Sequence, residues 1–305
     1  MALSIFSLIV LAPSSWSKDL DTLKKTLEAE IMGSGVEVSL AFKDLQTGET
    51  LFIGEKDMVH AASTMKVPVL IEVFKQAEDG KFRLDDRIVI KNEFHSIVDG
   101  SPFSLNKEDD SDPEIYGLIG TSLTIRELAE RMITVSSNLA TNILIELVKP
   151  DNVMSTMELL GIRRLRVLRG VEDSKAFERG WNNLTDAHDL LRVMETIASG
   201  KAGSLPSCRE MTLILEKQKF RDGIPAGVPA GVPVGNKTGS ITGMEHDSAI
   251  VFPLGRRPYI LVVLTRGVKS SEEGERLIAR LSRLIYSGVI LQQAGVDETP
   301  VFCYK

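Results

Sequence analysis

A serine and a lysine three residues apart carry the first chemical signal in this sequence. They lie in the segment Ser63-Thr64-Met65-Lys66. A serine hydroxyl becomes a strong nucleophile when a neighbouring base takes its proton, and an amine is such a base. Residues i and i+3 share one face of a helix. The spacing therefore predicts that the Lys66 amine can reach the Ser63 hydroxyl and activate it for acyl transfer.

The Ser-x-x-Lys spacing alone is weak evidence, because the chain contains it three times. Ser15–Lys18 follows an apolar leader and Ser104–Lys107 lies in a polar stretch, so no predicted helix fixes their geometry. Ser63 precedes the apolar run 67–74, and serine is also a common helix N-cap. On this segment alone the N-cap interpretation is favoured over a catalytic one. Pro68 removes a backbone donor, so we expect an irregular first turn.

A second segment supplies another amine beside small hydroxyl residues. Lys237-Thr238-Gly239-Ser240 lies within residues 232–241, whose pattern is typical of a strand. Negative charge develops on the carbonyl oxygen during acyl transfer, so the transition state needs hydrogen-bond donors. The two segments together predict a nucleophile, a base and donors for one acyl-transfer site.

Two further segments accompany this pair. Ser136 and Asn138 lie two residues apart at a predicted helix junction, a pattern that by itself indicates capping. Glu172 lies 36 residues beyond Ser136, in a glycine-flanked loop where a glutamate is usually solvated. Neither segment indicates catalysis when it is taken alone.

In this order and spacing, the four segments resemble the class A β-lactamases and the penicillin-binding serine acyl-enzymes, over nearly the whole chain. The resemblance implies a serine β-lactamase that hydrolyses the β-lactam amide through an acyl-enzyme on Ser63 and confers antibiotic resistance. It implies that Lys66 takes or relays the proton of Ser63. It also implies that Ser136 passes a proton to the leaving nitrogen and that Glu172 activates the hydrolytic water.

The same resemblance assigns residues that bind the substrate. It implies that Asn138 holds the side-chain amide of the substrate and that Lys237 supplies positive charge near the substrate carboxylate. Thr238 and Ser240 would offer hydroxyl groups to that carboxylate. The backbone N–H groups of Ser63 and Ser240 would form the oxyanion hole.

Three positions depart from the family pattern. The middle of the Ser-x-Asn motif is Ser137 instead of aspartate, and Ala176 stands where the family places an asparagine that shares the hydrolytic water. No arginine for the substrate carboxylate occurs in the segment 245–248. Asn182 and Asn183 are candidates to fold back in place of the missing asparagine. We expect these changes to affect deacylation and substrate range more than acylation.

Two other catalytic or binding motifs fit the sequence less well. Residues 231–238 approach a phosphate-binding loop, but Asn236 occupies a position that requires glycine and no helix follows. His246 and Asp247 could belong to a Ser–His–Asp triad, but the chain has no Gly-x-Ser-x-Gly elbow. Adjacent residues on a strand also point to opposite faces.

The elements that must position these residues follow from the hydrophobic periodicity. We predict a helix at 18–32 and a hairpin of strands at 36–42 and 51–53. A mainly helical block follows, with helices at 64–78, 124–134, 138–148, 151–160, 185–199 and 206–219. The chain then returns to strands and ends in a helix, at 232–241, 247–252, 259–265 and 272–294.

This order predicts an α/β (α+β) fold, with a five-stranded antiparallel sheet flanked by the N- and C-terminal helices and an inserted all-α domain, the arrangement of the β-lactamases and transpeptidases. The sheet domain is discontinuous and comprises residues 18–62 and 221–305. The inserted helical domain comprises residues 63–220. Ser63 then lies at the domain boundary, and clefts between domains are favoured ligand sites.

Two irregular stretches interrupt this order. Residues 91–120 form a long polar connection, and a loop of that length is often functional or mobile. Residues 223–235 carry a near-repeat of Pro, Ala, Gly and Val, which we interpret as a local linker.

Composition limits the partners of this 305-residue chain. The net charge of −6 argues against a nucleic-acid-binding surface. Cys208 and Cys303 are too few to form a disulfide framework, and the four histidines show no metal-ligand spacing. We therefore expect no metal and no cofactor. The resemblance implies a small β-lactam as the ligand, and we expect a monomer.

The N-terminus carries an apolar run at 3–11 that is too short to span a membrane. Small residues near Ser17 are typical of a signal-peptide cleavage site, although no Lys or Arg precedes the run. The alternative is a buried N-terminal strand or helix. We predict a signal peptide at 1–17, no stable membrane insertion, and a periplasmic or secreted protein.

Three functions remain open from the sequence. The first is a secreted β-lactamase, the second is a related serine hydrolase that acts on peptidoglycan peptides or esters, and the third is a penicillin-binding sensor module that deacylates slowly. Glu172 favours turnover, whereas Ala176 opposes fast turnover.

Overall fold

The computed structural model describes residues 15–291. The prediction of a signal peptide at 1–17 therefore lies almost entirely outside the described residues. Its last three residues begin helix α1 (Ser15–Ser34). The last three residues of the predicted terminal helix also lie outside the described part, in which helix α9 spans Ser271–Leu291.

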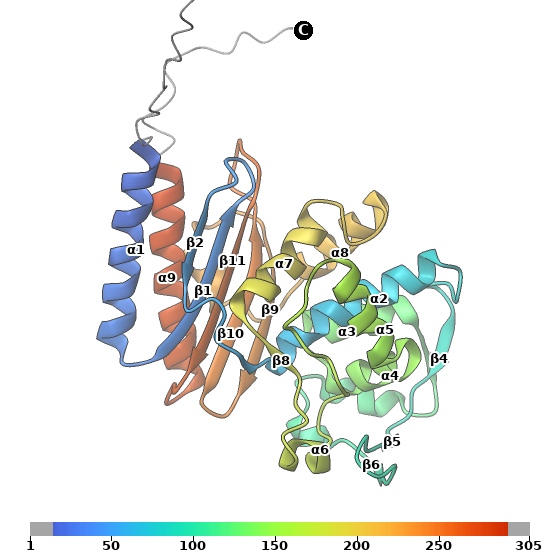
Figure 1. Cartoon of the computed structure of the whole chain (residues 1–305). Coiled ribbons are helices and arrows are strands. Elements are labelled where there is room, and N and C mark those ends of the chain that lie inside the picture. Colours follow the sequence, from blue (N-terminus) through green and yellow to red (C-terminus); the bar gives the residue numbers. More distant parts are fainter. Residues whose placement is uncertain (1–14, 292–305) are drawn as a thin grey trace, which may run out of the picture.

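A five-stranded antiparallel sheet forms the centre of the molecule (Figure 1), which confirms the predicted fold class. Its strand order is β2-β1-β11-β10-β9. The strands are β1 (Glu37–Asp44), β2 (Thr50–Ile53), β9 (Val234–Ile241), β10 (Met244–Val251) and β11 (Tyr259–Arg266). Strand β1 pairs with β11 in the register Leu40↔Val263, so the two ends of the chain meet in one sheet.

Helices α1 and α9 lie side by side on one face of this sheet (Figure 1). Leu27 of α1 and Leu281 of α9 are fully buried with Leu40, Phe42 and other apolar residues of the strands. Fully burying one such side chain contributes about 2 kcal/mol, so this layer fixes the sheet against its helices.

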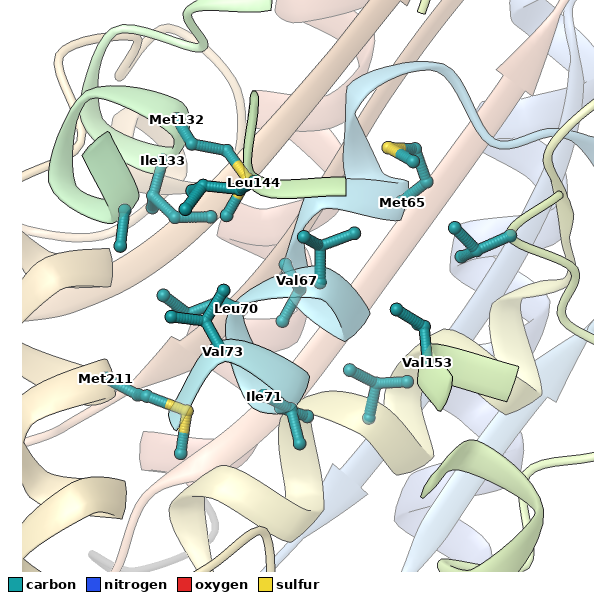
Figure 2. Packing of buried hydrophobic residues seen from close by; sticks show 14 of the residues in the cluster. Met65, Val67, Leu70, Ile71, Val73, Met132, Ile133, Leu144, Val153 and Met211 are labelled. Carbon is teal, nitrogen blue, oxygen red and sulfur yellow. The ribbon is translucent and has the colours of Figure 1, made fainter. Parts of the chain in front are cut away.

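The helical block lies beyond the opposite face. Helix α2 (Lys66–Glu78) is buried on almost all sides, and Figure 2 shows its apolar side chains gathered with those of its neighbours. These neighbours are α3 (Ile125–Thr134), α4 (Asn138–Val148), α5 (Pro150–Leu159) and α8 (Leu205–Glu216). A helix that is apolar all round belongs in a core, so α2 is a rigid support for the residues at its N-terminus.

Helix α7 (Ala187–Ala198) packs on β1, β10 and β11 and joins the helical block to the sheet. The same hydrophobic cluster includes Ile250 and Val262 of the sheet and Leu70 of α2. The core is thus continuous between the two parts. The predicted domain boundaries after residues 62 and 220 stay a prediction.

The remaining elements are short. They are β3 (Val59–His60), η1 (Ala62–Met65), β4 (Arg87–Val89), β5 (Phe94–His95), β6 (Pro102–Phe103), η2 (Lys107–Asp109), η3 (Pro113–Leu118), β7 (Ser122–Thr124), α6 (Ser174–Glu178), β8 (Leu184–Thr185) and η4 (Ile224–Gly227). The stretch that we interpreted as a linker contains η4, which packs against α9: a Cβ at Gly227 would lie 2.4 Å from the Ala279 carbonyl oxygen. None of the helices within residues 15–291 combines the length and apolar character needed to cross a membrane.

Candidate active site

Ser63 lies in the one-turn 3-10 helix η1, directly before α2, and is half-buried. The irregular first turn that Pro68 led us to expect is this 3-10 turn. The N-cap interpretation of Ser63 is wrong, because the N-cap positions of η1 and α2 are Ala61 and Met65. Neither position makes a side-chain cap. Ser63 is left at the edge of a cavity instead of closing a helix end.

The backbone before Ser63 is strained and tightly enclosed. Ala62 has a φ of 45°, a region that residues other than glycine rarely occupy. Its N–H donates to Nδ1 of His60 over 3.0 Å. On the other side, a Cβ at Gly239 would lie 3.1 Å from both the Ser63 nitrogen and the Ala62 Cβ. Gly239 therefore lets the edge strand β9 approach the turn that carries Ser63.

Lys66 is fully buried and points toward the start of α4. Its Nζ donates to the Ser136 carbonyl at 2.7 Å, to Ser136 Oγ at 3.1 Å and to Asn138 Oδ1 at 2.9 Å. Within the described part of the chain, no hydrogen bond joins this amine to Ser63 Oγ, so the direct contact that the i, i+3 spacing predicted is not present in this conformation.

Burial lowers the pKa of Lys66 to about 7, because desolvation disfavours the charged amine. The negative charges of Asp110 and Glu172 act in the opposite direction and raise this pKa. A large fraction of Lys66 is therefore neutral near pH 7, which is the form that can accept a proton.

Ser136 lies between two amines. Lys237 donates to Ser136 Oγ over 3.0 Å and to the Thr238 carbonyl over 2.8 Å. Burial and the neighbouring Lys66 hold the pKa of Lys237 well below its usual range, while Asp247 opposes this shift. Ser136 itself has a φ of 58°, a strained conformation of the kind that persists at functional sites. Its hydroxyl can pass a proton between the two lysines.

Asn138 connects this group to Glu172. Its Oδ1 accepts from Lys66, while its Nδ2 donates to Glu172 Oε1 over 2.8 Å. Desolvation raises the pKa of Glu172, and the hydrogen bonds from Asn138 and the Asn106 backbone partly offset this. The structure thus brings Lys66, Ser136, Asn138, Glu172 and Lys237 into one hydrogen-bonded chain, and the roles that the resemblance assigned to them stay predictions.

Asn142 holds the loop of Glu172 in place, a role that the sequence analysis did not assign to it. Its Oδ1 accepts from the Val171 N–H at 2.7 Å and its Nδ2 donates to the Val171 carbonyl at 3.0 Å. A Cβ at Gly170 would lie 2.4 Å from Asn142 Oδ1, so the loop needs glycine there. Glu172, two residues after Gly170, has a φ of 63°. The sequence signal for this role of Asn142 was its i, i+4 spacing from Asn138, because residues four apart lie on the same face of a helix.

The missing asparagine is not replaced by its neighbours. Ala176 is fully buried in α6, and its N–H donates to Asp173, the N-cap of that helix. Asn183 bonds the backbone of residues 168–169, and Asn182 Oδ1 accepts from the Arg169 guanidinium. In the described structure neither asparagine reaches Glu172, so the expectation that one of them folds back is wrong.

The hydroxyl of Ser240 is already engaged. It donates to Glu245 Oε1 at 2.5 Å, and Glu245 is 5% exposed. The Thr238 hydroxyl has no hydrogen-bond partner among residues 15–291 and faces the same cavity of about 270 Å³ as Ser63 and Ser136. Five carboxylates also line this cavity, namely Asp109, Asp222, Glu245, Asp247 and Glu275. The side of the cleft that lacks the arginine is therefore acidic.

A second cavity of about 370 Å³ opens on the other side of Ser63. Glu172, Phe177 and Ile241 line it, so this side offers apolar surface beside the carboxylate. The backbone N–H groups of Ser63 and Ser240 stay the predicted oxyanion hole, and both residues line both cavities.

The competing motifs have structural roles. His246 Nδ1 accepts from the Thr265 N–H at 3.2 Å, and its Nε2 donates to the His60 carbonyl at 3.0 Å. Asp247 accepts from Asn236 Nδ2 and from the Ile224 N–H. Residues 231–238 lead into strand β9 and not into a helix. The triad and phosphate-loop alternatives are therefore wrong.

Comparison with known proteins places this site in a family. The model of the beta-lactamase enzyme family matches residues 22–289. A β-lactamase of Streptomyces albus G is 26% identical over 265 residues, which cover 83% of this chain and 80% of that protein.

Solved structures agree with this match. A mutant of the class A β-lactamase of the last common ancestor of Gram-negative bacteria is 26% identical, with a TM-score of 0.76 over 88% of this chain and 98% of that one. The structure of PBP-A is 23% identical, with a TM-score of 0.75 over 88% and 96%. At that identity the likeness to PBP-A extends to the fold alone.

Proposed function

Because the chain belongs to the beta-lactamase enzyme family, we propose that it is a class A-like serine β-lactamase that forms its acyl-enzyme on Ser63. Membership of this family makes it a hydrolase. The observation that carries the serine mechanism is the position of Ser136 Oγ, 3.1 Å and 3.0 Å from two buried amines in the cavity that Ser63 also lines.

Acylation begins with neutral Lys66. As Ser63 Oγ attacks the lactam carbonyl carbon, its proton passes to Lys66 Nζ. The developing oxyanion accepts from the backbone N–H groups of Ser63 and Ser240. When the C–N bond breaks, Lys66 donates a proton to Ser136 Oγ, which gives its own proton to the leaving nitrogen. Lys66 returns to its neutral form, and the ester on Ser63 remains.

Deacylation needs a base on the opposite side of the ester. Glu172 lies there, held by Asn138 and by the loop that Asn142 fixes. Its carboxylate takes a proton from water as the water oxygen attacks the ester carbon. The bond between that carbon and Ser63 Oγ then breaks, and the proton passes from Glu172 to Ser63 Oγ, which regenerates the carboxylate and the free serine. Because Ala176 offers no side-chain donor or acceptor beside Glu172, we expect this step to be slower than acylation.

A chromogenic cephalosporin assay with intact-mass measurement during the reaction tests this function. We expect turnover, and a mass adduct that accumulates because deacylation is slow. Ser63→Ala should abolish both. Ser104→Ala is the matched control, since Ser104 begins another Ser-x-x-Lys copy on the exposed surface and should leave both unchanged. An adduct that persists in Ser63→Ala would refute the assignment of the nucleophile.

Ala176 also favours a second candidate, a penicillin-binding module that acylates and does not turn over. A stable adduct without turnover would indicate this function. Absence of both would favour the third candidate, a serine hydrolase of peptidoglycan peptides or esters, which a panel of D-alanyl peptides and esters would identify.

We further propose that residues 1–17 direct the protein to the periplasm or the medium, where it acts as a monomer in antibiotic resistance. Expression of the full chain in a susceptible bacterium should raise the inhibitory concentration of a β-lactam. Removal of residues 2–17 should abolish that protection while the purified protein keeps its activity.

A further inference from the structure

Asp110 is a buried carboxylate that none of the roles above uses. It lies in the long connection 91–120 and is 6% exposed. Both of its oxygens accept from the Asn138 N–H, at 3.0 and 3.1 Å, and one accepts from the Leu139 N–H at 2.9 Å. The Asp112 N–H and the Tyr116 hydroxyl complete its partners, at 3.0 and 3.1 Å.

These contacts place a negative charge at the start of α4. The first N–H groups of a helix have no partner within the helix, and the helix dipole favours an anion there. The hydroxyl oxygen of the local cap, Ser137, accepts only from the Ala140 N–H among the described residues, at 3.3 Å. The N–H groups of Asn138 and Leu139 are therefore left for Asp110, which arrives from a segment 28 residues earlier.

The orientation of Asn138 depends on this anchor. Asp110 holds its backbone nitrogen, while its side chain accepts from Lys66 and donates to Glu172. A shift of this residue would change the surroundings of the acylation base and the deacylation base together. The same connection also contacts the Glu172 loop, because Ser96 Oγ donates to Asp173 at 2.8 Å.

The rest of the connection is fastened so that Asp110 keeps its place. Arg131 of α3 binds both oxygens of Asp112, at 2.8 and 2.9 Å. Lys175 of α6 pairs with Asp99 at 2.7 Å. These contacts attach the long polar connection to α3 and α6 on either side of Asp110.

We propose that Asp110 is a positioning residue of the active site, which caps α4 and thereby fixes Asn138 between Lys66 and Glu172. This inference rests on the proposed function for its kinetic consequences, but its electrostatic consequence is independent of catalysis. The charged groups around the Lys66 amine are Asp110, Glu172 and Lys237. Asp110 and Glu172 raise the pKa of Lys66, so removal of the Asp110 charge will lower it.

Asp110→Asn in the full chain tests the proposal. The amide keeps the shape but turns an N–H₂ group toward backbone donors. We expect acylation of a chromogenic cephalosporin to slow by about tenfold to a hundredfold, as for a misplaced catalytic group. We also expect the rising limb of its pH profile, and the midpoint of the Lys66 amine in an NMR titration, to move to lower pH.

Asp186→Asn is the matched control. Asp186 is also a buried aspartate that caps a helix, α7, and accepts the N–H of Asp189 at 2.7 Å, but none of its side-chain hydrogen bonds within residues 15–291 goes to Asn138, Lys66 or Glu172. We expect it to lower the melting temperature without moving the Lys66 midpoint or the pH limb. The assignment of the Lys66 signal comes from its loss in Lys66→Arg.

Asp110→Glu separates position from charge and remains informative if Asp110→Asn does not fold. It should keep the Lys66 midpoint near that of the native chain while acylation slows, because the longer side chain displaces both oxygens from the Asn138 N–H. A native chain that forms no adduct would refute the proposed function, and the NMR midpoint would still test Asp110. The inference would be overturned if Asp110→Asn kept both the native acylation rate and the native Lys66 midpoint, or if Asp110→Glu kept the native acylation rate.

Discussion

The ionisation of Lys66 gives the sharpest test of the acylation mechanism. The amine is fully buried, and its three hydrogen bonds go to Ser136 and Asn138. Burial lowers its pKa from 10.5 to about 7. If neutral Lys66 is the base, the acylation rate must rise with pH through about 7 and level off above it.

The magnitude follows from this pKa. A change from 10.5 to about 7 corresponds to about 5 kcal/mol of differential interaction between the two protonation states. At pH 7 about half of the lysine is then neutral, against about one molecule in 3,000 for an unperturbed lysine. The neutral fraction at pH 8 is about tenfold that at pH 6, so acylation should accelerate by the same factor.

Stopped-flow measurement under single-turnover conditions from pH 5.5 to 9 gives the acylation rate. Glu172→Gln keeps Lys66 and removes the carboxylate that could act as the base instead. The limb should survive in this variant and move to lower pH, because the charge of Glu172 raises the pKa of Lys66. Lys66→Arg should lose about 10² to 10⁴ in acylation, because a guanidinium stays charged at these pH values. Lys107→Arg, on the exposed Ser-x-x-Lys copy, should acylate at the native rate.

An acylation rate that does not change between pH 6 and 8 would refute the role of Lys66 as the base. So would a uniformly low acylation rate, without a limb, in Glu172→Gln, since the titrating base would then be the glutamate. A Lys66→Arg variant within tenfold of the native rate would have the same consequence.

Three further predictions concern other parts of the molecule. Gly170→Ala places a Cβ 2.4 Å from Asn142 Oδ1, so the deacylation rate measured by decay of the mass adduct should fall by tenfold or more while acylation changes little. Glu245→Gln removes one charge from the acidic cavity wall, and the KM of a carboxylate-bearing β-lactam should fall by roughly fivefold to tenfold, an effect of about 1 kcal/mol. The buried Tyr259 hydroxyl has no partner among residues 15–291, so Tyr259→Phe should raise the free energy of unfolding in urea by about 1 kcal/mol, and a loss of stability would show that the hydroxyl is satisfied.

Much of the fold could be predicted because local periodicity and burial agree along most of the chain. The predicted helix at 124–134 differs by one residue from α3, whose capping box joins Thr124 and Glu127. Strand β10 begins at Met244, three residues before the predicted start. Glu245 and His246 look like a polar loop in the sequence, but their hydrogen bonds to Ser240 and to the backbone allow them to be buried in a strand.

The site was predictable to the extent that short motifs encode it. The motifs named Glu172, Asn138, Lys66, Ser136 and Lys237 as site residues, and the structure joins them by hydrogen bonds that the motifs do not specify. The hydrogen bond from the Ser240 hydroxyl to Glu245 could not be predicted from the sequence, because it depends on the register between β9 and β10. The anchoring of α4 by Asp110 depends in the same way on the path of a connection without strong periodicity.

The groups proposed for acylation are held by more hydrogen bonds than the group proposed for deacylation. Lys66 has three hydrogen bonds and Ser136 lies between two amines, so the groups that form the acyl-enzyme are fixed. Glu172, the proposed base of deacylation, has a raised pKa. Among the described residues its carboxylate accepts a hydrogen bond from a single side chain, that of Asn138. Ala176, at the position where the family places an asparagine, is fully buried and lines neither cavity. On the proposed mechanism we therefore expect the ester to form faster than it is released, and the lifetime of the adduct will report how much of the orientation of the hydrolytic water Asn138 provides alone.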